Sequence, residues 1–156
     1  MTDNMYDAVI LGAGVIGLAI SRKLSEEGKE VLIIEEQGQI GSVTSSRNSG
    51  VIHAGVYYDK ESLKAKFCPE GNRRLYEYCI SRSIPHLNTG KFIVATSNNE
   101  IEKLDNILNQ ANEAGVVDIE KVTGSYISDK EPLIKCVEGL YVSSSGIVDA
   151  LSLIHI

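Results

Sequence analysis

The sequence contains no tryptophan, few prolines, no excess of basic residues and only three cysteines. Cys68, Cys79 and Cys136 form no CxxC pair and have no zinc-ligand spacing, so we expect reduced, partly buried thiols and no metal site. The 15 Lys and Arg are outnumbered by 21 Asp and Glu. A net charge of −6 argues against broad electrostatic binding of nucleic acid, although a locally positive pocket could still take an anionic substrate.

Long apolar runs are also absent, and none approaches the roughly 18 residues that a membrane-spanning helix needs. The first residues, Met1-Thr2-Asp3-Asn4-Met5, are polar and acidic, and they lead straight into a predicted strand. They lack the basic start and the apolar stretch of a secretory signal. We therefore expect a cytoplasmic protein with no transmembrane segment.

Two short apolar runs flank a glycine-rich turn near the amino terminus. Residues 6–11 have the length of a strand, and the apolar positions between Val15 and Leu24 suit a helix that packs on a sheet. Gly28 ends that helix, and residues 31–34 form a second, fully buried strand. Strand, glycine turn, helix and strand without polar alternation predict a parallel βαβ unit.

The turn itself, Gly12-Ala13-Gly14-Val15-Ile16-Gly17, is the G-x-G-x-x-G pattern of dinucleotide-binding folds. In such a unit Gly12 permits the tight turn, Gly14 lets the backbone approach the pyrophosphate, and Gly17 lets the helix pack closely. The helix amino terminus offers N–H groups to the phosphates. Glu35, followed by Glu36, can accept a hydrogen bond from a ribose 2′-hydroxyl and would repel a 2′-phosphate. The motif therefore predicts dinucleotide binding and disfavours NADP, but it does not separate FAD from NAD.

A segment rich in small hydroxyl residues, residues 41–50, follows the second strand. Its hydroxyl and backbone N–H groups can donate to phosphate oxygens, and Arg47 can pair with a phosphate through two hydrogen bonds. A plain surface loop is an equally good interpretation of this composition. The candidate contacts in this segment are Ser45, Ser46, Arg47, Asn48, Ser49 and Gly50.

The second half of the sequence predicts an α+β arrangement. Residues 91–96 form a strand, and Asn99 with Glu102 resembles a helix capping box. Apolar residues then recur at three- and four-residue spacing until Gly115, as on the buried face of a helix, and residues 140–142 predict a further strand.

Residues 46–58, Ser-Arg-Asn-Ser-Gly-Val-Ile-His-Ala-Gly-Val-Tyr-Tyr, resemble the signature of the L-2-hydroxyglutarate oxidase/dehydrogenase family. The likeness continues in five further segments, residues 62–66, 70–72, 75–79, 90–95 and 146–149. That family belongs to the D-amino-acid-oxidase-like group of FAD enzymes. Pro69 departs from the pattern, and we expect it to break the helix in which it lies.

The resemblance implies an α/β fold: a Rossmann-type FAD-binding domain over residues 1–86 and the start of an α+β substrate domain over residues 87–150. FAD would lie along the glycine motif and Glu35, with residues 45–53 approaching the pyrophosphate and the flavin. The implied cofactor-binding residues are Gly12, Ala13, Gly14, Val15, Ile16, Gly17, Glu35, Glu36, Ser45, Ser46, Arg47, Asn48, Ser49, Gly50, Val51 and His53.

His53 is the candidate catalytic residue. Beside the flavin it would bind the substrate or accept the hydroxyl proton while a hydride passes to flavin N5. Alternatively, it would shape the flavin pocket by hydrogen bonding without titrating.

The resemblance implies oxidation of an L-2-hydroxy acid, above all L-2-hydroxyglutarate to 2-oxoglutarate. Electrons would then pass to oxygen or to a membrane quinone, which would bring the protein into peripheral contact with the inner face of a membrane. Two alternatives remain open: a related FAD dehydrogenase, for example one that acts on glycerol 3-phosphate, and a nucleotide-binding module without turnover.

The resemblance also implies that the chain is the first third or so of a longer enzyme. We therefore expect a truncated chain that is inactive alone and exposes an apolar edge. Residues 151–156 match the translation of a transposon end used in sequencing libraries, and we expect this tail to be non-native.

Overall fold

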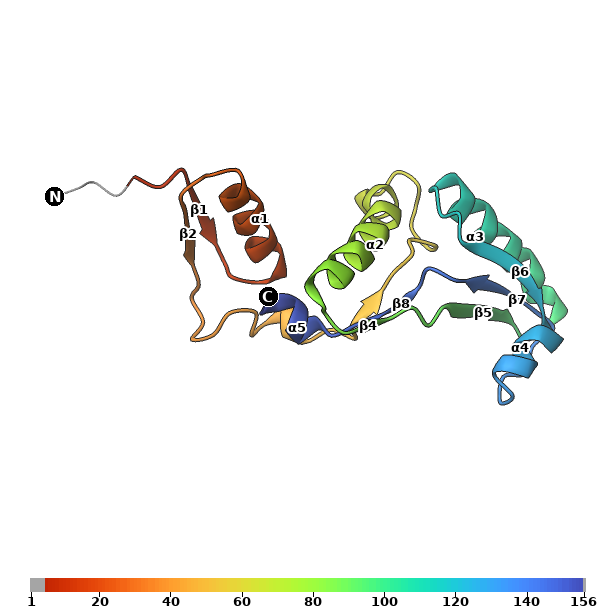
Figure 1. Ribbon diagram of the computed structural model, residues 1–156. Coiled ribbons are helices and arrows are strands. Elements are labelled where there is room, and N and C mark those ends of the chain that lie inside the picture. Colours follow the sequence, from red (N-terminus) through yellow and green to blue (C-terminus); the bar gives the residue numbers. More distant parts are fainter. Residues whose placement is uncertain (1–4, 156) are drawn as a thin grey trace. The chain divides into compact units, whose positions relative to one another are not determined.

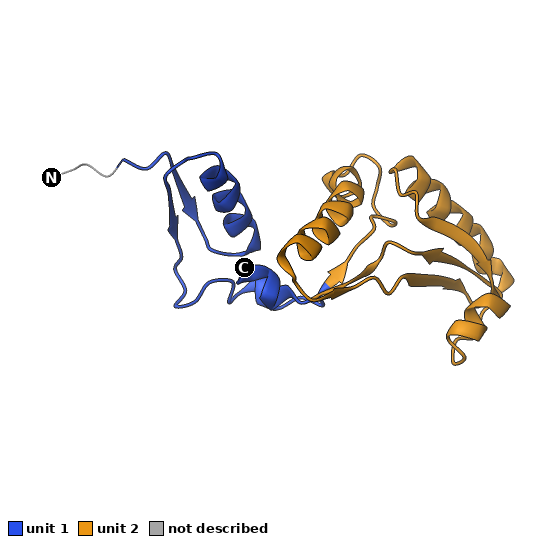
Figure 2. Ribbon diagram, in the orientation of Figure 1, with its two compact units in different colours: residues 1–50, 149–156 blue, residues 51–148 orange. Residues whose placement is uncertain are grey.

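The computed structural model describes residues 5–155 (Figure 1). Residues 1–4, which carry most of the polar start noted above, and Ile156, the last residue of the expected non-native tail, lie outside the described residues. The chain forms two compact units (Figure 2). The first comprises residues 1–50 and 149–156, and the second comprises residues 51–148. These limits differ from the expected domain boundary at residue 86, and the division into domains stays a prediction.

The first unit contains the predicted βαβ arrangement. Strands β1 (Ala8–Leu11) and β2 (Val31–Ile34) pair in parallel, with Ala8 opposite Val31 and Leu11 opposite Ile34. Helix α1 (Val15–Glu26) connects them, and Gly28 follows it at a φ of 77°. A left-handed residue just after a helix end is the conformation that favours glycine. The βαβ prediction is thus confirmed.

The remaining elements of the first unit are the short 3₁₀ helix η1 (Thr44–Ser46) and helix α5 (Ala150–Ile154). Asp149 caps α5, because its carboxylate accepts hydrogen bonds from the N–H groups of Leu151 and Ser152. Ile154 is buried, and its Cγ2 lies where a side chain on Gly41 would be, 2.6 Å from an added Cβ. The expected tail therefore packs on this unit; its origin stays a prediction.

The second unit is built on a three-stranded antiparallel sheet in the order β5 (Lys91–Ala95), β7 (Glu138–Val142), β6 (Ile119–Thr123). Helix α3 (Ile101–Glu113) packs against this sheet through Leu104 and Ala111, and helix α4 (Gly124–Lys130) follows β6. Leu140 and Val142 of the central strand are fully buried. The amphipathic spacing predicted this helix correctly.

The expected capping box of α3 is wrong. Asn99 lies in the 3₁₀ helix η2 (Asn98–Glu100), and α3 begins without a side-chain cap. Glu100 takes up the local donors instead: its Oε2 accepts from the Thr96 backbone N–H and from the Thr96 hydroxyl, both at 2.8 Å. A carboxylate one position before the helix start therefore replaces the pairing expected between Asn99 and Glu102.

A second, smaller antiparallel sheet joins β3 (Val51–Ile52), β8 (Gly146–Val148) and β4 (His86–Leu87), with β8 in the middle. Helix α2 (Leu63–Arg82) lies between β3 and β4 in the chain. Ser62 caps its start by accepting from the Ala65 N–H, and Ser83 ends it at a φ of 54°. These caps give α2 defined ends on both sides.

The expected break at Pro69 is wrong, because α2 continues through this residue. The pyrrolidine ring lies against Gly55, where an added Cβ would be 3.2 Å from Pro69 Cδ. An interior proline costs a helix about 3 kcal/mol. Tertiary packing of α2, including this contact, offsets that cost.

Apolar side chains remain exposed on the first unit. Among the described residues β1 and β2 pair only with each other. Leu11 is 80% exposed and Val9 51% exposed, and Ile33 and Ile34 of the adjacent strand are exposed as well. The apolar edge expected from the sequence is therefore present.

Along residues 5–155, no helix combines the length and apolar character needed to cross a membrane.

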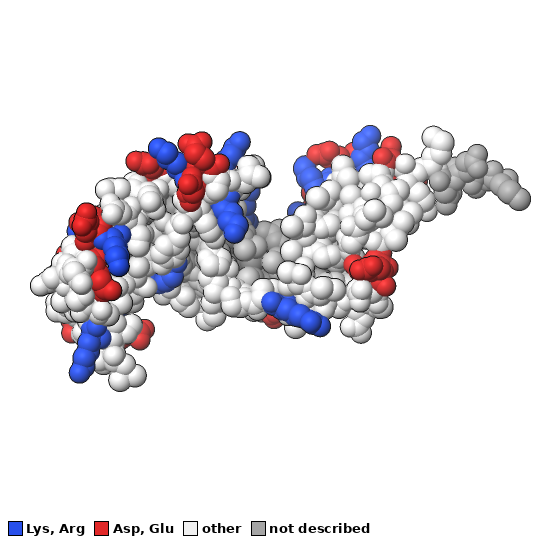
Figure 3. All heavy atoms as spheres, turned by 180° about the vertical axis from the view of Figure 1, so that it is seen from behind, with Lys and Arg blue, Asp and Glu red and all other residues white. Residues whose placement is uncertain are grey.

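Charged side chains of both signs are interspersed on the visible face of each unit (Figure 3). Along α1 and α2, charged side chains form i,i+4 ion pairs, namely Arg22–Glu26, Lys23–Glu27, Arg73–Glu77 and Arg74–Glu70. Exposed pairs of this kind contribute about 0.3–0.5 kcal/mol each, so they are not what holds the fold together.

Two glycines of the second unit should respond in opposite directions to replacement by alanine. An added Cβ at Gly146 would collide with the Tyr76 hydroxyl and the Leu87 carbonyl oxygen, whereas at Gly71 it would meet open space within a helix. We expect Gly146→Ala to destabilise by about 1–3 kcal/mol and Gly71→Ala to stabilise by about 0.5–1 kcal/mol. Urea unfolding followed by circular dichroism would measure both. Equal effects would contradict the close packing at Gly146 and the open space at Gly71.

Candidate functional site

The turn from β1 into α1 has the geometry that its glycines predict. Gly12 has a φ of 97°, a left-handed conformation that glycine adopts without strain, and its N–H donates to the Ile34 carbonyl at 2.7 Å. An added Cβ at Gly17 would collide with the Gly12 carbonyl oxygen. The first turn of α1 therefore lies directly against the end of β1, as close packing of helix on strand requires.

Glu35 lies at the end of β2 and binds this turn. Its Oε2 accepts from the Ala13 N–H at 2.6 Å, and its Oε1 accepts from the Gln37 N–H at 2.9 Å. The hydrogen bond from Ala13, supported by that from Gln37, lowers the pKa of the Glu35 carboxyl below its ordinary value of 4.5. Glu35, the residue predicted to bind the ribose, thus lies against the glycine motif. Glu36 follows it in the chain, with its side chain exposed.

Ser45 caps the start of α1 from a distant part of the chain. Its Oγ accepts from the Val15 N–H at 3.0 Å, and an added Cβ at Gly14 would lie 3.1 Å from the same oxygen. Gly14, at the N-cap position of α1, provides no side-chain cap itself. A serine hydroxyl from η1 therefore satisfies one of the orphan N–H groups of the helix start.

The other residues of the hydroxyl-rich segment bond mainly to one another. The Ser46 hydroxyl donates to the Val43 carbonyl at 3.2 Å. Asn48 Nδ2 donates to the Ser45 carbonyl at 2.7 Å, and Asn48 Oδ1 accepts from the Gly50 N–H at 2.8 Å. Arg47 and Ser49 are exposed on the same segment. These bonds give the loop its own fold around Ser45.

Val51 and His53 belong to the second unit, whereas the other predicted site residues belong to the first. Val51 pairs with Ile147 in the β3–β8 ladder, and His53 follows β3 directly. The His53 side chain is exposed and lines a hollow of about 440 Å³. The walls of this hollow are mainly apolar, and they include Leu63, Phe67, Cys68 and Leu75.

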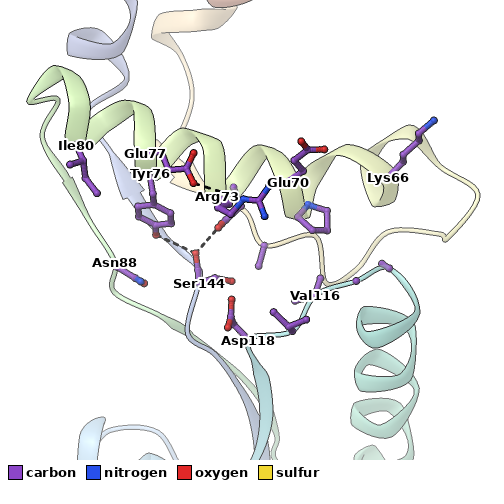
Figure 4. Close-up of a pocket in the computed structure, with 16 residues that line it drawn as sticks. Lys66, Glu70, Arg73, Tyr76, Glu77, Ile80, Asn88, Val116, Asp118 and Ser144 are labelled. Carbon is purple, nitrogen blue, oxygen red and sulfur yellow. Dashed lines mark hydrogen bonds and ion pairs between the residues drawn. The ribbon is translucent and has the colours of Figure 1, made fainter.

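A larger hollow, of about 590 Å³, lies on another face of α2 (Figure 4). It contains none of the predicted site residues, and charges of both signs line it, among them Lys66, Glu70, Arg73 and Asp118. Size alone therefore does not identify the functional hollow. The smaller one is the better candidate, because it holds Val51 and His53.

Sequence reasoning gave no role to the polar residues of α2. Asn72 is 8% exposed, and its Nδ2 donates to the carbonyls of His53 and Ser144. The Tyr76 hydroxyl donates to the same Ser144 carbonyl at 3.2 Å (Figure 4). The only signal in the sequence was that Asn72 and Tyr76 lie one helical turn apart within the family-like segments.

Among residues 5–155, no group of three or more His, Cys, Asp or Glu is placed to hold a metal ion.

Comparison with known proteins gives consistent results. The family described as DAO, FAD dependent oxidoreductase, matches residues 7–155. The chain is 47% identical over 146 residues to the mitochondrial L-2-hydroxyglutarate dehydrogenase of Arabidopsis thaliana, covering 94% of this chain and 30% of that protein. It is 38% identical to L-2-hydroxyglutarate dehydrogenase of Escherichia coli (strain K12), covering 92% of this chain and 34% of that protein. The chain therefore spans about a third of the length of these relatives.

Solved structures share the fold over nearly the whole chain. FAD-bound L-alpha-glycerophosphate oxidase from Mycoplasma pneumoniae matches with a TM-score of 0.88 and 27% identity, over 96% of this chain and 40% of that chain. Glycine oxidase from Bacillus cereus ATCC 14579 matches with a TM-score of 0.80 and 24% identity, over 97% of this chain and 43% of that chain.

The lowered pKa of Glu35 predicts how the first unit responds to acid. Because the folded pKa lies below 4.5, the stabilisation is complete above that pH and is lost as the pH falls through the folded pKa. Glu35→Gln should lower the stability at neutral pH and flatten the loss of stability between about pH 5.5 and pH 3. Melting temperatures across that range would test this, with Glu36→Gln as the exposed neighbouring control. An unchanged acid slope in Glu35→Gln would contradict the assignment.

Proposed function

The chain belongs to the family of FAD-dependent oxidoreductases, and from that premise we propose that the protein oxidises L-2-hydroxyglutarate to 2-oxoglutarate. The observation that carries this proposal is the 47% identity over 146 residues to a protein named L-2-hydroxyglutarate dehydrogenase. The likeness to structures of 27% identity or less supports the fold and the use of FAD more than it supports the substrate.

The glycine turn fits a bound dinucleotide. Gly12 adopts a left-handed φ that suits glycine, Gly17 has no side chain to collide with the Gly12 carbonyl oxygen, and the helix start follows this turn. Residues 12–17 and Glu35 would hold the two ends of the adenosine diphosphate part, with Ser45 beside the pyrophosphate. When bound, FAD supplies a two-electron oxidant that can take a hydride from an alcohol carbon.

His53 would take the hydroxyl proton of the substrate as the hydride leaves. Histidine suits this task, because its charge changes near neutral pH. Its exposed imidazole lines a mainly apolar hollow, where a bound substrate could reach it. The remaining predicted contacts to FAD would come from Ser46, Arg47, Asn48, Ser49, Gly50 and Val51.

The electrons would leave the protein to oxygen or to a membrane quinone, and the second acceptor would require peripheral contact with a membrane. For the compartment, we propose the cytoplasm, with peripheral membrane contact if a quinone is the acceptor. Of the two relatives named above, the Arabidopsis protein is named mitochondrial, whereas the name of the Escherichia coli protein gives no compartment.

Anaerobic mixing of the full-length, FAD-loaded protein with L-2-hydroxyglutarate should bleach the visible flavin absorbance within the time of turnover. The D enantiomer is the matched control and should leave the flavin oxidised. Bleaching by glycerol 3-phosphate instead would favour the glycerophosphate alternative, which the Mycoplasma structure supports. No bleaching by either compound, with FAD bound, would leave a nucleotide-binding module without turnover.

The base role of His53 has its own test. His53→Gln should slow flavin reduction by about 10²- to 10⁴-fold while FAD remains bound, because a positioned general base contributes about that much. Stopped-flow absorbance would measure the reduction rate. His86→Gln is the control, since His86 lies on β4 of the same small sheet, with its Nδ1 2.8 Å from the Ile84 carbonyl oxygen. A wild-type rate in His53→Gln would exclude the base role.

A further inference from the structure

Asn72 is a buried amide in the middle of α2 that bonds two distant backbone segments. Its Nδ2 donates to the His53 carbonyl at 3.2 Å and to the Ser144 carbonyl at 2.9 Å. Its side chain is nearly inaccessible, with the residue 8% exposed. A buried polar side chain in a helix interior is costly unless its hydrogen bonds are made, so the two bonds account for its presence there.

The orientation of the amide is determined by chemistry. Both partners of Asn72 are carbonyl oxygens, which only accept hydrogen bonds, so the NH₂ group must face them. A carboxylate of the same shape would place an acceptor against two acceptors. Asn72→Asp therefore removes both bonds and adds repulsion with almost no change in volume.

Of the two carbonyls that Asn72 binds, that of His53 depends more on the Asn72 amide. The β3–β8 ladder stops at Ile52, and Gly55, at a φ of 97°, turns the chain away shortly after. Within the described residues, the side chain that donates a hydrogen bond to the His53 carbonyl is that of Asn72. The Ser144 carbonyl also receives the Tyr76 hydroxyl at 3.2 Å (Figure 4). Loss of the Asn72 side chain would therefore remove the side-chain donor of the His53 carbonyl, while the Ser144 carbonyl would keep the Tyr76 hydroxyl as a donor.

We propose that Asn72 is a positioning residue for His53: its amide fixes the backbone from which the imidazole projects into the smaller hollow. This inference rests on the proposed function, because it gives His53 the role of the base. Lys64 and Cys68 are the other titratable side chains that line this hollow, and both lie on α2 with Asn72. A base must be held within hydrogen-bond reach of its proton, and a displacement of about 1 Å can cost about 100-fold in rate.

The alternative is that Asn72 only ties α2 to the β7–β8 turn. Tyr76→Phe separates the two roles, because it removes a hydrogen bond to Ser144 and leaves the bond to His53 in place. If Asn72 acts through Ser144, Tyr76→Phe should reproduce its loss. If Asn72 acts through His53, Tyr76→Phe should leave the reduction rate near that of the wild type.

The experiment uses the full-length holoenzyme and the variants Asn72→Asp, Asn72→Ala and Tyr76→Phe. Both Asn72 variants should retain FAD and slow flavin reduction about 10- to 100-fold with little change in substrate affinity. The pH profile of reduction should also move. In a His53→Gln background the Asn72 substitutions should have no further effect on the rate, because the group they position is absent.

A second measurement does not need turnover. Diethyl pyrocarbonate modifies neutral imidazoles, and peptide mass spectrometry would give the rate of His53 modification as a function of pH. The Asn72 variants should change this profile, and Tyr76→Phe should not. If they do and no substrate reduces the flavin, the positioning role stands and the proposed function fails.

Three results would overturn the positioning role. One is an unchanged reduction rate and His53 modification profile in both Asn72 variants of an enzyme that turns over. Another is an equal loss in Tyr76→Phe. The third is loss of FAD from both Asn72 variants while Tyr76→Phe retains it, since Asn72 would then be required for folding.

Discussion

Ala13 and Val15 form hydrogen bonds with three separate segments, and the first unit depends on this convergence. The Ala13 N–H donates to Glu35 at the end of β2, and the Ala13 carbonyl accepts from the Gly41 N–H at 2.9 Å. The Val15 N–H donates to Ser45. The end of β2, the loop after it and η1 are thus each fixed to one turn, and the glycines of that turn leave the space this requires.

The second unit uses a different device, a long helix with polar side chains directed inward. Asn72 and Tyr76, one turn apart on α2, bond backbone carbonyls of β-sheet connections. Backbone groups at the ends of short strands lack ladder partners, so a helix that supplies donors can replace them. The two-residue strand β3 is stable in this position because β8 pairs with it and α2 holds the residue after it.

Local signals predicted local structure well. The βαβ unit, its glycine turn and helix α3 followed from periodicity, glycine placement and strand length, all of which act within about 30 residues. The errors at Pro69 and at Asn99 have different causes. Gly55, distant in the chain, leaves room for the proline ring. At Asn99 the helix begins later than expected, at Ile101, and the local hydrogen bonds run from Thr96 to Glu100. Asn72 was not predicted as a site residue because its partner Ser144 lies 72 positions away in the chain.

The pairing of β3 with β8 brings the two ends of the second unit side by side, with Val51 opposite Ile147. The second unit is therefore an insertion with adjacent ends, and the segment after it, residues 149–154, returns to pack on η1 of the first unit. Because the second unit brings its own ends together by folding, the entropy of joining residues 50 and 149 is already spent when the chain re-enters the first unit. To the first unit, the whole second unit is therefore equivalent to a short loop.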